Sequence, residues 1–306
     1  MSKYLVTGGA GFIGSKLAHR LIENGNHVTI IDNLSTGFKQ NIPKNAIFIE
    51  GNCQDSKLYE SLDEKFDAIY HIAGQSSGEI SFDDPVYDLQ TNTQSTLLLL
   101  SYAVRTGCSR FIYASSMSIY GDQPDMAISE VQSFKPKSFY GVGKIASEHY
   151  LRIYQDFNIQ STALRLFNVY GPGQNMKNLR QGMVSIYLAM AFKNKKIVVK
   201  GSKERFRDFV YIDDVINAFV DVEKNSNSFG KVYNIATGVR TNIQTLLDEI
   251  ESILPFEIVS KVDGTTAGDQ HGIFADIKLI KDEIGWEPMI NLKDGLKMMI
   301  ESVFHD

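Results

Sequence analysis

Residues 7–14 read Thr7-Gly8-Gly9-Ala10-Gly11-Phe12-Ile13-Gly14 and follow a short apolar run at 4–6. Apolar residues then recur at helical spacing from Leu17 to Ile22, so the glycines are predicted to lie on a strand-to-helix turn. In such a turn Gly8 permits the tight reversal, Gly11 lets the backbone approach a pyrophosphate, and Gly14 lets the helix pack closely on the strand. The N–H groups at the helix N-terminus then face the phosphates. The stretch predicts a dinucleotide site.

An acidic residue after the next predicted strand narrows the dinucleotide to NAD. Asp32 ends the apolar stretch 28–31, at about the distance from the glycines where a carboxylate accepts hydrogen bonds from an adenosine ribose. A carboxylate would repel the 2′-phosphate of NADP, so Asp32 favours NAD. Asp55, after the third predicted strand, is either an adenine contact or the N-cap of the following helix, and the two roles are compatible.

Composition indicates a soluble globular enzyme. The 306 residues are 43% hydrophobic and 22% charged, with a formal net charge of −5, which gives no reason to expect nucleic acid or an anionic membrane as partner. Cys53 and Cys108 lack CxxC spacing, so neither a disulfide framework nor a metal site is expected. The apolar run 97–100 is too short for a bilayer, and the first strand begins too early for a signal peptide. We therefore expect a cytoplasmic protein.

Short apolar strands alternate with helical segments through the first half of the chain. Strands are predicted at 3–7, 27–31, 46–50, 67–71, 110–114 and 161–165, and helices at 12–24, 56–63, 92–106 and 141–157. Such alternation predicts an α/β fold with a Rossmann-type doubly wound parallel sheet.

The pattern changes after residue 166. A helix is predicted at 176–192, a strand at 197–200, a strand and helix at 208–223, a strand at 231–236 and two or three helices in 241–306. We expect an NAD-binding domain at 1–166 with returning segments near 208–238. A smaller mixed α/β domain at 167–207 and 239–306 would bind the substrate.

Tyr140 and Lys144 are the strongest catalytic candidates. Residues four apart share one face of a helix, and an ammonium beneath a phenol lowers the phenol pKa from about 10. Tyr140 could then act as a general base, helped by the positive nicotinamide ring. Such a pair is also common on protein surfaces. A predicted strand runs into a serine cluster at 115–118, where Ser116 can hydrogen-bond a substrate oxygen; a strand end capped by small polar residues is the alternative.

A family resemblance joins these segments. The matching stretches are TGGAGFIG at 7–14, IIDNLSTG at 30–37, HIAG at 71–74, Asn92 in TNTQST, SSMSIYGD at 115–122, YGVGK at 140–144, RLFNVYGPGQ at 165–174, RDFVYIDDV at 207–215, AGDQ at 267–270, Ala275-Asp276 and GWEP at 285–288. Together they resemble the extended short-chain dehydrogenase/reductase family and, within it, the UDP-glucose 4-epimerase-like nucleotide-sugar epimerases. The resemblance covers nearly the whole chain.

The resemblance implies roles for individual residues. Ser116, Tyr140 and Lys144 match the catalytic set. NAD contacts are implied for Gly8, Gly11, Phe12, Ile13, Gly14, Asp32, Asn33, Ser35, Thr36, Gly37, Asn52, Cys53, Ile72, Ala73, Gly74, Gln75, Asn92, Tyr140 and Lys144. Substrate contacts are implied for Ser76, Ser116, Met117, Asn168, Arg180, Arg207 and Asp269.

The implied activity is NAD-dependent 4-epimerisation of a nucleotide sugar, most simply a UDP-hexose, through a transient 4-keto intermediate. The alternative is a nucleotide-sugar dehydrogenase or reductase of the same family that uses free NAD(H). The resemblance also implies a homodimer that pairs helices 92–106 and 141–157 of each subunit, and a place in carbohydrate metabolism such as polysaccharide biosynthesis.

Three positions depart from related patterns. Family dehydratases and decarboxylases carry acids just after the catalytic Ser or Thr, whereas this chain has Met117 and Ser118, which predicts neither activity. Thr266 stands where many UDP-sugar epimerases have a diphosphate-binding arginine; either Lys203, Arg205 or Arg180 takes over this role, or the nucleotide binds in a different position. Ile273 occupies the position that often gates acetamido sugars, which leaves N-acetyl tolerance open.

Overall fold

The computed structural model describes residues 1–265, 268 and 270–305. Its described residues form a seven-stranded parallel sheet in the order β11-β6-β5-β4-β1-β2-β3. The strands are β1 (Lys3–Thr7), β2 (His27–Asp32), β3 (Ile47–Glu50), β4 (Ala68–His71), β5 (Arg110–Ser116), β6 (Gln160–Leu166) and β11 (Lys231–Ile235). The order reverses between β1 and β4, and ligands bind such sheets outside the carboxyl ends of the strands at that point. The predicted Rossmann-type fold is confirmed.

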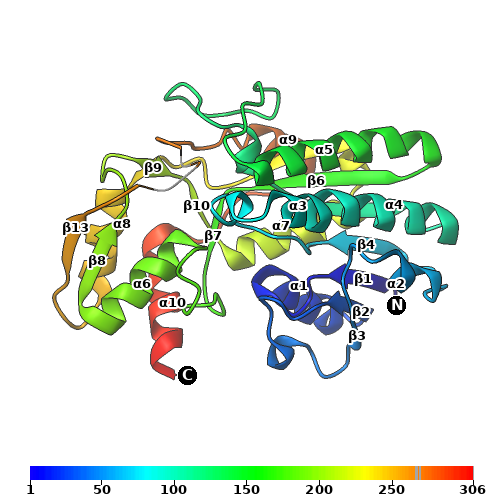
Figure 1. Cartoon of the computed structure of the whole chain (residues 1–306), viewed down its shortest axis with the longest axis horizontal. Coiled ribbons are helices and arrows are strands. Elements are labelled where there is room, and N and C mark those ends of the chain that lie inside the picture. Colours follow the sequence, from blue (N-terminus) through cyan, green and yellow to red (C-terminus); the bar gives the residue numbers. More distant parts are fainter. Residues whose placement is uncertain (266–267, 269, 306) are drawn as a thin grey trace.

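Helices cover both faces of this sheet (Figure 1). One face carries α1 (Phe12–Glu23) and α7 (Ile212–Lys224), and the other carries α2 (Ser56–Glu60), α4 (Ser95–Thr106) and α5 (Phe139–Tyr154). The strands alternate between the two faces: Tyr4 and Val6 pack with α1, while Leu5 packs with α4. This two-sided burial explains why the strands read as continuous apolar runs.

A smaller lobe lies beside the carboxyl ends of the strands (Figure 1). It contains α6 (Met183–Asn194), α8 (Ile243–Ile253), α10 (Leu292–His305), β8 (Lys196–Val199) and β13 (Val259–Val262), with β8 and β13 paired in parallel. Further short elements are β7 (Asn168–Tyr170) paired with β10 (Phe209–Tyr211), β9 (Phe206–Arg207) paired with β12 (Thr241–Asn242), α9 (Lys278–Ile284), and the 3-10 turns η1 (Lys39–Asn41), η2 (Ile80–Phe82), η4 (Met117–Ile119), η5 (Gln155–Phe157) and η6 (Ser226–Ser228).

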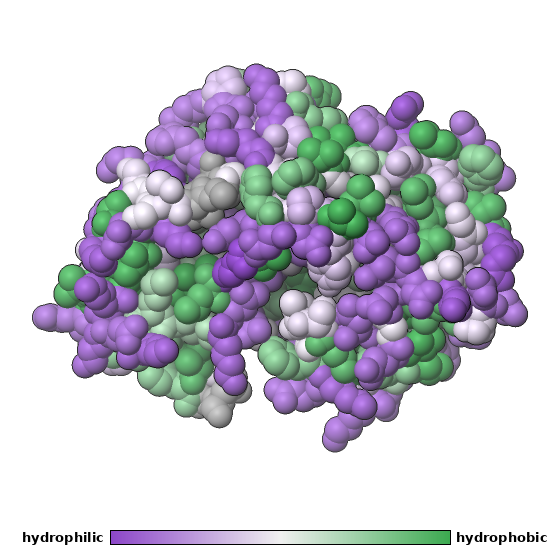
Figure 2. Space-filling view, viewed as in Figure 1, coloured by the Kyte–Doolittle hydropathy of each residue, from purple (hydrophilic) through white to green (hydrophobic). Residues whose placement is uncertain are grey.

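The surface is hollowed between this lobe and the sheet, with polar side chains around the rim (Figure 2). Among the described residues, no helix combines the length and apolar character that a bilayer crossing requires. The predicted division of the chain into two domains at residue 166 stays a prediction.

The helix predicted at 92–106 begins earlier and is irregular. It continues from α3 (Pro85–Leu89) through a π-helical turn, η3 (Gln90–Gln94), into α4. Asp84 starts α3 by accepting the Tyr87 N–H at 2.9 Å, and Pro85 fits the first helical turn. The π turn contains Asn92, and such turns often mark functional sites.

The helix predicted at 176–192 begins seven residues later, at Met183. The preceding segment forms turns instead, because the side chains of Asn175 and Asn178 accept the N–H groups of Lys177 (2.9 Å) and Arg180 (3.1 Å). Such local bonds compete with a helix.

Candidate active site

The glycine-rich turn joins the carboxyl end of β1 to α1, as its sequence predicts. Gly8 has a φ of +71°, and its N–H donates to the Ile31 carbonyl at 2.8 Å. A Cβ at position 14 would lie 2.2 Å from the Gly8 oxygen, whereas one at position 11 would meet that oxygen at 3.3 Å and otherwise open space. Within the described chain, α1 begins with no side-chain cap and no acid in its first turn. Its N–H groups therefore suit a pyrophosphate.

Asp32 lies at the end of β2, beside this turn, and is 8% exposed. Its Oδ2 accepts the Ala10 N–H at 2.9 Å and its Oδ1 accepts the Leu34 N–H at 2.8 Å. Each oxygen keeps a further lone pair for a ribose hydroxyl. The loop 33–37 closes over the turn, since a Cβ at Gly37 would lie 2.7 Å from the Ala10 backbone. These residues fit NAD.

Other predicted cofactor residues border the same edge of the sheet. Asn33 donates to Asn52 Oδ1 at 2.8 Å, and the buried Cys53 accepts the Tyr59 hydroxyl on its carbonyl oxygen at 2.9 Å. Asp55 accepts the Lys57 N–H at 3.0 Å. Its predicted role as the N-cap of α2 is thus confirmed, and its adenine contact stays a prediction.

We expect Asp32→Ala to weaken NAD binding by roughly 10- to 100-fold, because hydrogen bonds to a charged group contribute about 1.5–3 kcal/mol. Titration calorimetry on protein freed of nucleotide measures the affinity. Asp63→Asn, which changes an exposed carboxylate that pairs with Arg105, is the control and should change affinity far less. Equal affinity of Asp32→Ala and the wild type would make the assignment of Asp32 wrong.

The predicted catalytic residues border one cavity of about 240 Å³. Ser116 ends β5, and Tyr140 and Lys144 lie on α5, whose first turn is capped by Ser138 accepting the Gly141 N–H at 3.2 Å. Lys144 Nζ lies 5.5 Å from the centre of the Tyr140 ring and donates to the Ala114 carbonyl at 2.9 Å. The same cavity is lined by the predicted cofactor residues Phe12, Ile13, Ile72, Gly74 and Gln75.

Burial dominates the ionisation of this pair. It raises the pKa of Tyr140 to about 12, an effect that the Ser116 hydroxyl opposes. Burial also lowers the pKa of Lys144 to about 8, against the opposing effect of Asp88 and Glu148. The predicted depression of the Tyr140 pKa by Lys144 is therefore wrong for the protein groups alone, since burial raises this pKa.

A second cavity of about 290 Å³ shares Ser76, Met117, Asn168 and Gln181 with the first. Arg205 and Arg207 line its far end, and both are more than nine-tenths buried. Burial and the neighbouring Arg205 lower the pKa of Arg207 to about 10. Two buried guanidinium groups facing one cavity favour an anionic ligand. A larger cavity of about 490 Å³ lies along α1 and contains none of the three predicted catalytic residues.

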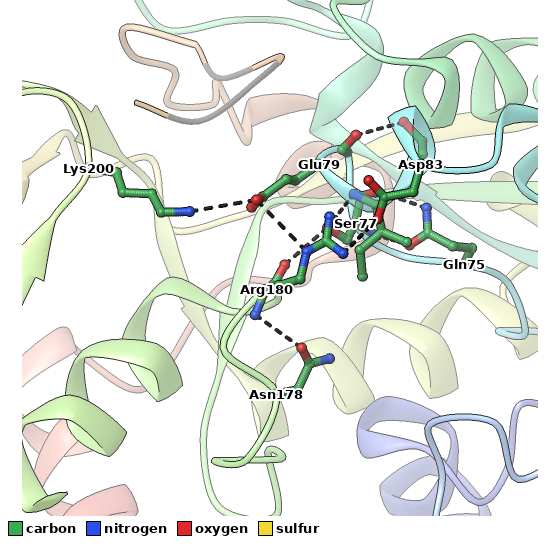
Figure 3. Close-up of polar contacts among 10 residues, drawn as sticks. Gln75, Ser77, Glu79, Asp83, Asn178, Arg180 and Lys200 are labelled. Atoms are coloured by element: carbon green, nitrogen blue, oxygen red, sulfur yellow. Dashed lines mark hydrogen bonds and ion pairs between the residues drawn. The ribbon is translucent and has the colours of Figure 1, made fainter. Parts of the chain in front are cut away.

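Arg180 lies at the rim of the second cavity between two carboxylates (Figure 3). Its Nη1 is 2.6 Å from Asp83 and its Nε is 3.8 Å from Glu79, which is also 3.6 Å from Lys200. The Ser77 hydroxyl donates to the Arg180 carbonyl at 3.0 Å. These contacts join the segment before α6 to the loop after β4. The charge of Arg180 is thus matched by two carboxylates.

Other residues that the sequence analysis names as candidate substrate contacts either do not line the two cavities or lie outside the described residues. Lys203 donates to Ser260 at 2.7 Å and is not among the described residues that line either cavity. Ile273 is buried in a small apolar cluster with Phe167. Thr266 and Asp269 lie outside the described residues.

Two buried carboxylates that hydrogen-bond residues of the site, Asp88 and Glu148, were not predicted from the sequence. Asp88 on α3 accepts Gln75 Nε2 at 2.8 Å and Asn92 Nδ2 at 3.2 Å. Glu148, one turn after Lys144, accepts both the Ser115 hydroxyl at 2.5 Å and the Arg165 guanidinium. The spacing of Lys144 and Glu148 on one helix face was the available signal for Glu148, whereas nothing local marks Asp88.

The fold and this site define an enzyme that oxidises and reduces its substrate with a bound dinucleotide. The chain belongs to the NAD dependent epimerase/dehydratase family, whose profile matches residues 4–236. It is 34% identical to a putative UDP-glucose 4-epimerase of Methanocaldococcus jannaschii, over 97% of this chain and 96% of that protein. A solved UDP-glucose 4-epimerase of Thermotoga maritima with UDP-glucose superposes with a TM-score of 0.94, at 33% identity and 99% coverage of both chains.

Similarity extends to a second activity. The chain is 30% identical to UDP-glucuronic acid decarboxylase 3 of Arabidopsis thaliana, over 98% of this chain and 88% of that protein. The predicted family and the NAD cofactor are confirmed by these comparisons. The choice between activities depends on the residues of the site.

Proposed function

We propose that this chain is a 4-epimerase of a UDP-hexose that works through a transient 4-keto sugar. One observation carries the proposal: Ser116, Tyr140 and Lys144 line one cavity, and none of the described residues around that cavity is Asp or Glu. The described part of the site thus has a base and a hydroxyl for reversible oxidation of an alcohol, but no carboxyl group to protonate a leaving hydroxyl. The epimerase names of the relatives point the same way.

Different residues of the chain would bind different parts of NAD. The N–H groups at the start of α1 would bind the pyrophosphate, Asp32 the adenosine ribose, and Gly74, Gln75 and Asn92 the catalytic end; Gly74 and Gln75 line the cavity that Tyr140 also lines. When bound, NAD supplies a hydride acceptor for C4 of the sugar and a donor that returns the hydride.

Tyr140 moves the proton. Its phenolate oxygen takes the proton of the sugar 4-hydroxyl, and the Ser116 hydroxyl hydrogen-bonds the same oxygen as its charge changes. The Lys144 ammonium stabilises the phenolate, and the bound nicotinamide cation adds to this effect. After the keto sugar turns to present its other face, Tyr140 returns the proton to the new 4-hydroxyl.

The second cavity would bind the nucleotide diphosphate. Arg207 is the residue predicted to bind the diphosphate. Thr266 replaces a second diphosphate-binding arginine of related enzymes, and we assign that role to Arg205, because Arg205 is buried and lines the same cavity. Asn168, whose Nδ2 donates to the Asp208 carbonyl at 3.1 Å, lies where the two cavities meet. Asp208 in turn accepts four hydrogen bonds, from Thr237, Gly238 and Ala275, and fixes the strand that carries Arg207.

We expect no decarboxylase or dehydratase activity, despite the similarity to a decarboxylase. Met117 and Ser118 stand where the dehydratases and decarboxylases of the family carry acids, and neither side chain is a proton donor of the strength that those reactions need. Incubation with UDP-glucuronate should release no CO₂, and UDP-glucose should give no 4-keto-6-deoxy sugar, as followed by proton NMR. Either product would contradict this reading of the site.

A substrate panel tests the proposal and its runner-up, a dehydrogenase or reductase. The enzyme is incubated with UDP-glucose, UDP-N-acetylglucosamine, UDP-glucuronate, and GDP- and CDP-hexoses, and 4-epimers are sought by proton NMR. We expect UDP-hexose to be epimerised without net change in NADH absorbance. Consumption or production of free NAD(H) without a 4-epimer would favour the alternative.

We further propose that the protein is a homodimer in which α4 and α5 of the two subunits pair. We also propose that it acts in the cytoplasm and supplies nucleotide sugars for polysaccharide synthesis. Exposed apolar side chains on this face support the pairing: Val104, Val142 and Ile153 are each more than one-third exposed. Light scattering after size exclusion measures the mass. Val142→Glu should yield monomers if the face is buried between subunits, and a monomeric wild type would contradict the proposal.

A further inference from the structure

Asp88 is a buried carboxylate outside the predicted site. It lies on α3, is 1% exposed, and its Oδ1 accepts hydrogen bonds from the neutral amides of Gln75 and Asn92. Among the ion pairs formed by the described residues, none within 4.0 Å involves Asp88. Burial of a carboxylate without a cation in contact with it lowers the stability of the fold. Stability therefore does not explain the presence of a buried Asp88, and a role in the site has to be considered.

Lys144 is the matching buried cation. It is 4% exposed, and its ammonium has a backbone carbonyl and the Tyr113 ring as neighbours, the ring centre at 4.7 Å. The α3 and α5 helices pack together: Asp88 Oδ2 lies 3.7 Å from the place a Cβ would take at Gly143, next to Lys144. On the other side, Lys144 Nζ lies 3.8 Å from the place of a Cβ at Gly74, next to Gln75.

The alternative counter-charge is already engaged. Glu148 lies one turn after Lys144, but its two oxygens bind the Arg165 guanidinium at 3.0 and 2.7 Å. The charge of Glu148 is therefore largely neutralised, and that of Asp88 is not.

We propose that Asp88 is a positioning residue of the reaction: its buried charge holds the Lys144 ammonium in place and its Oδ1 orients Gln75 and Asn92 at the catalytic end of the cofactor site. The inference rests on the proposed function, in which Tyr140 and Lys144 act on the sugar hydroxyl. It adds a residue on α3 to a site otherwise built from β5 and α5.

The sign of the effect follows from Coulomb's law. A nearby negative charge favours protonated Lys144 and disfavours ionised Tyr140, so Asp88 raises the pKa of both groups, against burial at Lys144 and in addition to burial at Tyr140. The other ionisable groups around the pair are His71, which burial and Lys144 keep neutral with a pKa of about 3, Tyr113, whose pKa burial raises, and the paired Glu148. Asp88 itself has its pKa raised by burial. Removing its charge lowers the pKa of both Tyr140 and Lys144.

The test is the pH dependence of kcat for Asp88→Asn. Activity needs ionised Tyr140 and protonated Lys144, so the ionisations of these two groups set the two limbs. We expect both limbs to move to lower pH, by about 1 unit. Asp88→Glu, which keeps the charge, should keep both limbs in place whatever its kcat. Asp84→Asn, which keeps the α3 cap, controls for disturbance of the helix.

A direct titration separates this inference from the proposed function. Lysines labelled with ¹³C at Cε are followed by NMR, and the Lys144 signal is assigned by its absence in Lys144→Met. The Lys144 titration should move to lower pH in Asp88→Asn. If Asp88→Asn does not fold, Asp88→Ser takes its place. If the wild type turns over substrate, and Asp88→Asn leaves both limbs and the lysine titration unmoved, the inference about Asp88 is overturned and the proposed function stands. If the wild type shows no turnover, the proposed function is overturned. The lysine titration would then still decide the inference about Asp88.

Discussion

Replacing Tyr140 with phenylalanine is expected to lower kcat by about 10²- to 10⁴-fold, the usual contribution of a positioned general base. The substitution removes a single oxygen from a side chain that lines the catalytic cavity and leaves the ring in place. Binding of NAD and UDP should be largely kept, because the pyrophosphate and adenosine ribose of NAD are assigned to the start of α1 and Asp32, and the substrate diphosphate to Arg205 and Arg207. Steady-state epimerisation measured by NMR gives kcat, and calorimetry gives the affinities.

Tyr150→Phe is the matched control, since it makes the same change on the same helix, in a partly buried side chain that packs against the core and lines neither cavity. It should keep kcat within a factor of about 3. Near-normal turnover by Tyr140→Phe would contradict the assignment of the base.

The largest stability effect is expected at Arg165, whose replacement by methionine should cost about 3–5 kcal/mol of unfolding free energy. Arg165 and Glu148 are almost fully buried, and the guanidinium also donates to the Tyr120 hydroxyl at 2.8 Å and the Glu130 carbonyl at 2.7 Å. Removing the cation leaves Glu148 as an uncompensated buried charge. Because Glu148 also holds Ser115, the residue before Ser116, kcat should fall as well.

A double-mutant cycle isolates the pair. Urea unfolding of Arg165→Met, Glu148→Gln and the double variant should give a loss for the double variant well below the sum of the two single losses. Lys3→Met, which removes an exposed ion pair with Glu64 of similar length, 2.8 Å, should cost about 1 kcal/mol or less. Additive losses, or a cost of Arg165→Met no larger than that of Lys3→Met, would contradict this account.

The sheet could be predicted because its strands carry their own signal. Parallel strands buried on both faces are continuous apolar runs, so β1 was placed at 3–7 without error and β2 to β6 within a few residues. The start of α3 was missed although Asp84-Pro85 is a recognisable cap, because the longer apolar pattern of 97–106 defined the helix. The delay of α6 to Met183 depends on asparagine side chains that bind the preceding backbone, which periodicity does not report.

The site was predictable to the extent that its residues lie in local motifs. The glycine turn, Asp32, and the Tyr140-Lys144 pair each lie at a sequence spacing that has a physical explanation in terms of binding or catalysis. Asp88 has none, because its role arises only when α3 packs against α5 and the loop after β4. The pKa of Tyr140 was misjudged for a related reason: spacing placed Lys144 nearby, whereas the degree of burial depends on the assembled fold.

The fate of the hydrogen on C4 tests the central claim most directly. UDP-glucose carrying deuterium at C4 is incubated with enzyme, and the product is analysed by NMR and mass spectrometry. If bound NAD accepts and returns the hydride within one site, the 4-epimer retains its deuterium, with no label passed to free NAD. A 4-epimer that carries solvent hydrogen at C4, or label that accumulates in released NADH, would contradict the account.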